Sequence, residues 1–173
     1  MARRPILRSA GHEGSRIAAV KVSIALLVAD SPLLETVLAW HWHEWSAEHA
    51  DADRDVWREQ LRRRACSDRI PFTVVATLND QAVGCLTVCD DDADERYEDR
   101  GPWLTGMLVI GTSRNLGVGR RLLVAAAERA RAFGARELWL HTGAAAQFYE
   151  RCGYQLIHRK ETLDDDAVLW RDL

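Results

Sequence analysis

The sequence has no apolar run that could cross a bilayer. The apolar run Val22 to Ala29 is far shorter than the roughly 20 residues that a membrane-spanning helix needs. Residues 1–20 contain scattered arginines among small and polar residues and lack the continuous apolar core of a secretory signal. We therefore expect a soluble, cytoplasmic protein with no membrane partner, in which residues 1–20 form a flexible tail and residues 21–173 form the functional domain.

The sequence also lacks any Cys-x-x-Cys pair, which argues against a zinc or dithiol redox site. Its four cysteines occur in apolar runs and are predicted to be buried free thiols: Cys66, Cys85, Cys89 and Cys152. His41 and His43 are two residues apart on a predicted helix and point in different directions, so they are poorly placed to share a metal ion. The sequence predicts no metal site.

No strong charge of either sign is present. The formal net charge of −3 gives no electrostatic reason to expect binding to nucleic acid. A chain of 173 residues is long enough to bury one core, and the usual domain size favours one domain over two. No dimer-forming pattern stands out, so a monomer and a homodimer are equally compatible with the sequence.

Strand and helix signals alternate along the chain. The runs that favour strands are about Val22–Ala29, Phe72–Leu78, Ala82–Cys89, Trp103–Ile110 and Glu137–His141, followed by a closing hairpin of Tyr154–Thr162 and Ala167–Arg171. Capping signals and apolar spacing predict helices at about Ser31–Glu48, Asp53–Cys66, Val118–Gly134 and Ala144–Cys152.

The helix between Trp103–Ile110 and Glu137–His141 has the length of a right-handed crossover, which makes these two strands parallel. The other connections are short or hairpin-like and favour antiparallel pairing. The predicted fold class is therefore α/β: a single-domain, mixed and mostly antiparallel sheet with a central parallel strand pair and helices on both faces.

A glycine-containing loop, Arg114-Asn115-Leu116-Gly117-Val118-Gly119, leads from the first of these parallel strands into the helix. A helix N-terminus offers unpaired N–H groups and the positive end of the helix dipole, and small residues let a phosphate approach. The loop lacks the Gly-Lys-Ser/Thr of a P-loop and the third glycine of a dinucleotide fingerprint. It is predicted to bind phosphate, and the alternative is a plain glycine-rich turn.

The spacing Val109, Arg114, Gly117 and Gly119 resembles the acetyl-CoA signature of the GCN5-related N-acetyltransferase (GNAT) family. Downstream, Ala145-Ala-Gln-Phe-Tyr149-Glu-Arg-Cys-Gly153-Tyr154 resembles the second signature of that family. The order of predicted strands is also similar to the family fold from about Val22 to the last residue. The resemblance implies an acetyl-CoA-dependent N-acetyltransferase, with acetyl-CoA as co-substrate and no metal.

The resemblance also implies which residues contact acetyl-CoA. The strand backbone at Met107, Leu108 and Val109 would bind the pantetheine arm, and the loop would hold the pyrophosphate. The full set of implied contacts is Met107, Leu108, Val109, Arg114, Asn115, Leu116, Gly117, Val118, Gly119, Arg120 and Thr142. At Thr142 many family members have asparagine, and this departure weakens one expected contact.

The resemblance places Tyr149 near the thioester sulfur, where a phenol could protonate the leaving thiolate. The alternative is a tyrosine that only packs in the core. A base must also accept a proton from the amine, and the family has no single fixed position for it. His141, at the end of a strand beside the cofactor path, is predicted to be this base or a polar contact of the cofactor. Asp92, in the acidic stretch Asp90–Asp99, is the other predicted base. A merely solvated acidic loop is the alternative for Asp92.

The amine acceptor is the least determined part of the prediction. Trp42 and Trp45 lie on one stripe of the first predicted helix, and the resemblance implies that this helix borders the acceptor. Core packing is the alternative for both. The acidic stretch, including Asp91, favours a cationic small molecule, such as an aminoglycoside or polyamine, or a peptide N-terminus. A non-catalytic acyl-CoA-binding regulatory module and a nucleotide-binding protein are the competing functions.

Overall fold

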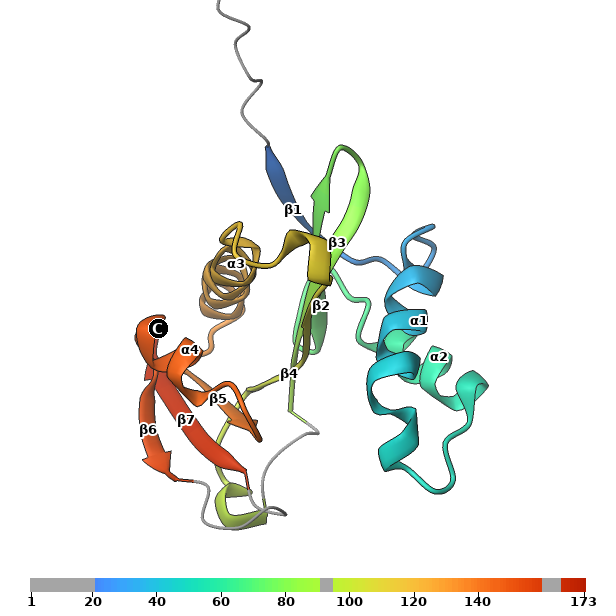
Figure 1. The fold of residues 1–173 in the computed structure, drawn as a ribbon. Helices are drawn as coiled ribbons and strands as arrows, with labels where there is room; N and C mark the ends of the chain where they lie inside the picture. The colour runs from blue at the N-terminus through green and yellow to red at the C-terminus, as the bar shows by residue number, and fades with distance from the viewer. Residues whose placement is uncertain (1–20, 91–94, 160–165) are drawn as a thin grey trace, which may run out of the picture.

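The computed structural model describes residues 21–90, 95–159 and 166–173, and the predicted tail at residues 1–20 lies outside these ranges. Within them the chain forms a seven-stranded sheet of order β1-β2-β3-β4-β5-β7-β6 (Figure 1). The strands are β1 Val22–Leu26, β2 Phe72–Leu78, β3 Gln81–Cys89, β4 Trp103–Val109, β5 Glu137–Thr142, β6 Gln155–His158 and β7 Ala167–Asp172. The helices are α1 Leu34–Trp45, α2 Arg54–Arg63, α3 Val118–Ala132 and α4 Ala146–Arg151, with short 3-10 helices at η1 Ser46–Glu48, η2 Glu95–Tyr97 and η3 Gly111–Ser113.

The strand pairing agrees with the sequence-based prediction. β4 and β5 are parallel, and each of the other pairs is antiparallel. β2 and β3 form a hairpin around Asn79 and Asp80, whose φ angles of 50° and 62° are those of a tight two-residue turn. The closing hairpin also forms, and its second strand, β7, lies between β5 and β6.

The first two helices are shorter than the sequence indicated: α1 begins later and ends earlier, and α2 ends earlier. α1 begins at Leu34, because Ser31 forms a turn in which its hydroxyl accepts a hydrogen bond from the Leu33 N–H at 3.2 Å. α2 is capped as predicted by Asp53, whose carboxylate accepts from two backbone N–H groups of the first turn. Within α2, Val56 is 52% exposed, whereas Leu61 is buried.

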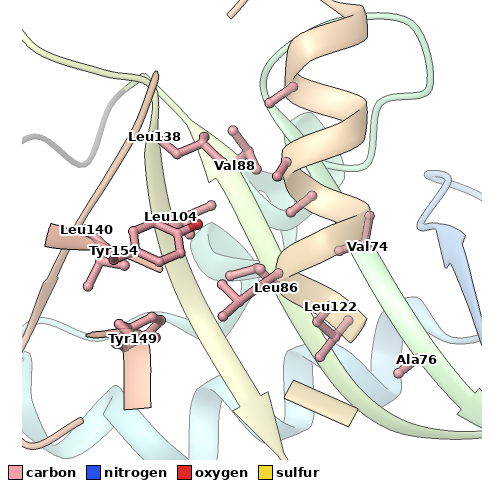
Figure 2. Packing of buried hydrophobic residues seen from close by; sticks show 14 of the residues in the cluster. Val74, Ala76, Leu86, Val88, Leu104, Leu122, Leu138, Leu140, Tyr149 and Tyr154 are labelled. Carbon is pink, nitrogen blue, oxygen red and sulfur yellow. The ribbon is translucent and has the colours of Figure 1, made fainter. Parts of the chain in front are cut away.

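Helices cover both faces of the sheet, as predicted (Figure 1). α3 and α4 lie on one side, and α1 and α2 lie on the other. Because side chains alternate along a strand, Val74 and Leu86 pack beneath α3 while Val75 and Cys85 pack beneath α1 and α2. Figure 2 shows the core on the α3 side, where Leu122 and Leu86 meet in the middle of the sheet.

The cysteines form no disulfide, as predicted, but their burial differs. Cys85 and Cys89 are fully buried, whereas Cys66 and Cys152 are only partly buried. Among the described residues, no group of three or more His, Cys, Asp and Glu side chains is arranged to hold a metal ion. In those same ranges no helix has both the length and the apolar character needed to cross a membrane.

Candidate active site

The parallel strands β4 and β5 separate after a short paired stretch. They pair at Trp103 with Trp139 and at Leu104 with Leu140, and then diverge. On its other side β4 carries one extra residue relative to β3. Cys85 pairs with Leu108 and Thr87 pairs with Thr105, so one intervening residue of β3 lies opposite two of β4. This β-bulge includes Gly106, whose φ is +57°. The bulge therefore lies where the two strands part.

A cavity of about 1010 Å³ occupies this opening and continues between the sheet and helices α1 and α2. Its β4 wall is formed by Leu104, Thr105, Gly106 and Met107, and the facing wall by His141 and Thr142 of β5 and by Gly143. Tyr149 also lines it. The helical wall is formed by Leu38, His41, Trp45, Glu48, His49, Trp57, Gln60, Leu61 and Arg64.

Tyr149 comes from α4 and reaches across to β4. Its hydroxyl donates a weak hydrogen bond to the Met107 sulfur at 3.4 Å, and its side chain is 8% exposed. Burial, with a smaller contribution from nearby Cys152, raises the pKa of Tyr149 to about 12. Figure 2 shows its ring beside Tyr154 and Leu140, with ring centroids of the two tyrosines 5.9 Å apart. The phenol is therefore protonated at neutral pH and lines the cavity.

The loop before α3 leaves the helix N-terminus available to a ligand. Gly117 caps α3 with a φ of +75°, and no side chain of the described residues caps the helix. Apart from the two adjacent residues, no atom of the described chain lies within 4 Å of where a Gly117 Cβ would be. The first turn carries Arg120 and Arg121 and no acidic residue, an arrangement that opposes the helix dipole unless an anion is bound. The residues present fit the pyrophosphate of acetyl-CoA.

Two other residues of this loop have structural partners that the sequence did not indicate. The Arg114 Nε–H donates a hydrogen bond to the Val109 carbonyl at 3.0 Å, which ties the loop to the end of β4. A Cβ at Gly119 would lie 3.0 Å from the Met107 methyl and 3.1 Å from Phe148. The small size of Gly119 therefore allows β4 and α4 to approach α3, while the open approach for an anion is at Gly117.

His141 lies at the end of β5 with its Nδ1 atom 2.9 Å from the Asp166 carboxylate. Both residues line the cavity and both are partly exposed. The contact with the carboxylate orients the imidazole ring. The next residue, Thr142, uses its hydroxyl to accept a hydrogen bond from the Ala145 N–H at 3.1 Å, ahead of α4.

The structure separates the two tryptophans that the sequence grouped. Trp45 lines the cavity and contacts His41 edge-on at 5.2 Å between ring centroids. Trp42 instead packs against Trp57 of α2 at 5.6 Å. Asp91 and Asp92, predicted as substrate-binding and catalytic residues, lie outside the described residues.

The sequence-based prediction considered His41 only as a metal ligand and missed its place in the cavity wall. It follows Leu34, Val37 and Leu38 at helical spacing, and this stripe faces the sheet. Burial lowers the pKa of His41 to about 4, so its ring is neutral at physiological pH. Arg64, which also lines the cavity, was not singled out either.

The opening between two parallel strands, the uncapped helix after a glycine loop and the buried tyrosine together define a class of protein: an acyl-CoA-dependent acyltransferase. The sequence model of the Acetyltransferase (GNAT) family matches residues 34–154, which is well over half of the chain. The chain belongs to this family. It is therefore an acetyl-CoA-dependent N-acetyltransferase, which confirms the predicted family, enzyme class and co-substrate.

Solved structures of several acetyltransferases share this fold. An aminoglycoside 6'-N-acetyltransferase complexed with coenzyme A is 17% identical with a TM-score of 0.69, over 87% of this chain and 96% of that one. A GNAT-family acetyltransferase from Streptococcus pneumoniae is 19% identical with a TM-score of 0.65, over 88% and 99%. N-acetylglutamate synthase from Neisseria gonorrhoeae, complexed with coenzyme A and N-acetyl-glutamate, is 16% identical with a TM-score of 0.63, over 88% and 35%. A comparison with curated protein sequences gives no match.

Proposed function

We propose that this enzyme transfers acetyl from acetyl-CoA to a primary amine by direct attack, with both substrates bound at once. The observation that carries the proposal is the continuity of the cavity, which runs from Met107 and Tyr149 at the strand opening to Trp45 and Trp57 on the helical wall. One space of about 1010 Å³ has room for the thioester end of the donor and an acceptor together. No transfer through a second site is needed.

The thiols near the site support direct transfer over an acyl-enzyme. Burial raises the pKa of Cys85 to about 12, and its side chain has no exposed surface. Burial also raises the pKa of Cys152, which is not among the residues that line the cavity. A thiol acts as a nucleophile only as the thiolate, so neither cysteine is set up to accept the acetyl group.

The donor would lie along β4 where this strand has left β5. Backbone groups of Met107, Leu108 and Val109 would bind the pantetheine arm, and the loop from Arg114 to Arg120 would hold the pyrophosphate at the start of α3. The Thr142 hydroxyl, which already accepts from Ala145, has its own hydrogen left to donate to the donor. When bound, acetyl-CoA supplies the thioester carbonyl that the amine attacks.

Tyr149 would stabilise the sulfur as the carbon–sulfur bond breaks. With a pKa of about 12 it keeps its proton, as a hydrogen-bond donor must. An ordinary thiol has a pKa of about 8.5, so complete transfer of the proton from this phenol to a thiolate is uphill. Tyr149 would therefore act mainly by donating a hydrogen bond to the developing thiolate. The proton that the amine loses, and not the proton of the phenol, would balance the charge of the leaving thiolate.

His141 is the described residue best placed to take that proton. The Asp166 carboxylate lies beside its Nδ1 and would stabilise the imidazolium that develops as the amine loses its proton. Asp92 stays an alternative base. His41 is less suited to this role because its pKa of about 4 makes it a weak base.

The acceptor we propose is a cationic small molecule or a peptide N-terminus. Glu48 and Asp166 contribute carboxylates to the cavity, against the single guanidinium of Arg64 among the described lining residues. The indole rings of Trp45 and Trp57 offer faces to a cation. Likeness to an aminoglycoside acetyltransferase is compatible with this class and does not identify the acceptor.

A panel of amines assayed by thiol release tests the proposal. It should contain aminoglycosides, polyamines, amino acids and short peptides, each with acetyl-CoA and with longer acyl-CoA donors. We expect turnover with a cationic amine and a kcat/KM that falls as salt increases. Binding of acetyl-CoA by calorimetry with no turnover on any amine would favour the non-catalytic acyl-CoA-binding module instead.

A further inference from the structure

The ring of His41 packs directly against the bulge of β4. A Cβ placed on Gly106 would lie 2.9 Å from His41 Cε1 and 3.1 Å from Nε2, closer than side chains approach one another. The Nε2 atom also lies 3.4 Å from the Cys85 sulfur, and the Cys85 thiol donates to the Gly106 carbonyl at 3.6 Å. An imidazole from α1 and a thiol from β3 thus contact the same residue of β4.

The position of Gly106 gives this contact a consequence for the site. The β4–β5 ladder ends at Leu104 and Leu140, two residues before Gly106, and the extra residue of β4 lies in this same segment. Gly106 has a φ of +57°, which a residue with a side chain adopts only at a cost. Glycine permits this conformation without imposing it, and the His41 ring from α1 lies against the strand at this point.

We propose that His41 is a positioning residue that fixes the bulge of β4 and thereby the strand edge that receives acetyl-CoA. This inference rests on the proposed function, because it assigns the donor to that edge. His41 acts through Gly106 and touches neither the thioester nor the amine in this role. Its neutral ring, with a pKa of about 4, stays in one protonation state throughout the range in which the enzyme would work.

A double-mutant cycle tests the contact. Gly106→Ala, His41→Ala and the double variant are compared for their affinity for acetyl-CoA by calorimetry, without any acceptor. With His41 present, the new methyl group must displace the ring, so Gly106→Ala should weaken binding by about tenfold or more. With His41→Ala the collision is gone, and the same change should weaken binding by about threefold or less, because only the backbone strain is left.

Two further variants separate positioning from chemistry. His41→Gln keeps a polar hydrogen-bonding group of smaller width and should recover part of the affinity that His41→Ala loses. His43→Ala is the matched control, because His43 is exposed on the same helix and is not among the cavity-lining residues. If His41→Ala does not fold, as judged by thermal unfolding, the cycle is made with His41→Gln.

Each outcome decides the proposal. If the losses of acetyl-CoA affinity in the two single variants simply multiply in the double variant, the proposal is overturned. A loss of kcat of about 100-fold in His41→Ala with unchanged acetyl-CoA affinity would also overturn it, because that is the result for a general base. A coupled cycle with kcat changed much less than the KM for acetyl-CoA would support it. If the wild-type protein does not bind acetyl-CoA at all, the proposed donor site is wrong. If it binds acetyl-CoA but the cycle shows no coupling, only the proposed role of His41 is wrong.

Discussion

The hydroxyl of Tyr149 donates to the sulfur of Met107 across 3.4 Å, so a side chain of α4 reaches the strand that leaves β5. Sulfur is a weak acceptor, and exchanging this partner for a thiolate costs the phenol little. The position of Met107 on the proposed donor strand puts the hydroxyl beside the path of the donor.

Tyr149→Phe removes this donor while keeping the ring. We expect kcat to fall by about 100-fold, with the affinity for acetyl-CoA changed by less than about threefold. Thiol release and calorimetry measure the two quantities. Tyr154→Phe is the control, since Tyr154 is a neighbouring buried tyrosine that is not among the cavity-lining residues. Equal effects of the two changes would show that both tyrosines only pack in the core.

The raised pKa of Tyr149 makes a separate prediction about pH. Because burial raises this pKa to about 12, the phenol stays protonated throughout the range from pH 6 to pH 10. The rate should therefore show no alkaline decline from this group below about pH 11. A decline centred near pH 10 that disappears in Tyr149→Phe would contradict the assignment.

Asp166→Asn tests the pairing with His141. Loss of the carboxylate removes the group that orients the imidazole and stabilises the imidazolium formed during the reaction, so kcat should fall by about tenfold. His141→Ala should lower kcat further, to about 100-fold below the wild-type protein. Asp172→Asn, an exposed change at the far end of β7, should leave kcat unaltered. A kcat that does not respond to Asp166→Asn would favour another base.

The depressed pKa of His41 predicts how stability depends on pH. Its folded-state pKa of about 4 is below the ordinary value of 6.5, so between these two values the unfolded chain binds more protons than the folded one. The free energy of unfolding should thus fall as the pH decreases through this window, and the contribution should be constant above it. For this one residue the loss between pH 7.5 and pH 5 is about 2 kcal/mol.

Urea unfolding at these two pH values checks the effect. His41→Gln should lose about 2 kcal/mol less than the wild-type protein over this interval, because glutamine does not titrate. His43→Gln, at an exposed position of the same helix, should follow the wild-type protein. Identical losses in all three proteins would mean that His41 is protonated in the folded state at pH 5.

The strands and the glycine-containing loop before α3 were predictable because their signals are local. The turn at Asn79 and Asp80, the crossover into β5 and the glycine at the start of α3 each depend on a few neighbouring residues. The glycine inside the β4 pattern, Gly106, was a further local signal for a bulge that went unused.

The partners of the site residues depend on contacts between distant segments. Asp166 reaches His141 because β7 is inserted between β5 and β6, with His141 opposite Val168. His41 faces the cavity because it continues the buried stripe of Val37 and Leu38, whereas the stripe chosen from the sequence began at Trp42. Helical spacing alone does not show which of the two overlapping stripes of α1 faces the sheet. In the structure the stripe of His41 does so, because the His41 ring packs against the bulge of β4.

Trp45 and Trp42 offer a test of the acceptor wall within one helix. Trp45 lines the cavity, so Trp45→Ala should raise the KM for the acceptor by about tenfold and leave the KM for acetyl-CoA nearly unchanged. Trp42 is not among the lining residues and packs behind Trp57, so Trp42→Ala should lower stability and change the acceptor KM by less than about threefold. Steady-state kinetics with the amine found in the panel, together with thermal unfolding, separates the two effects. An unchanged acceptor KM in Trp45→Ala would place the acceptor elsewhere, because removal of an indole from the wall of a filled pocket costs binding energy.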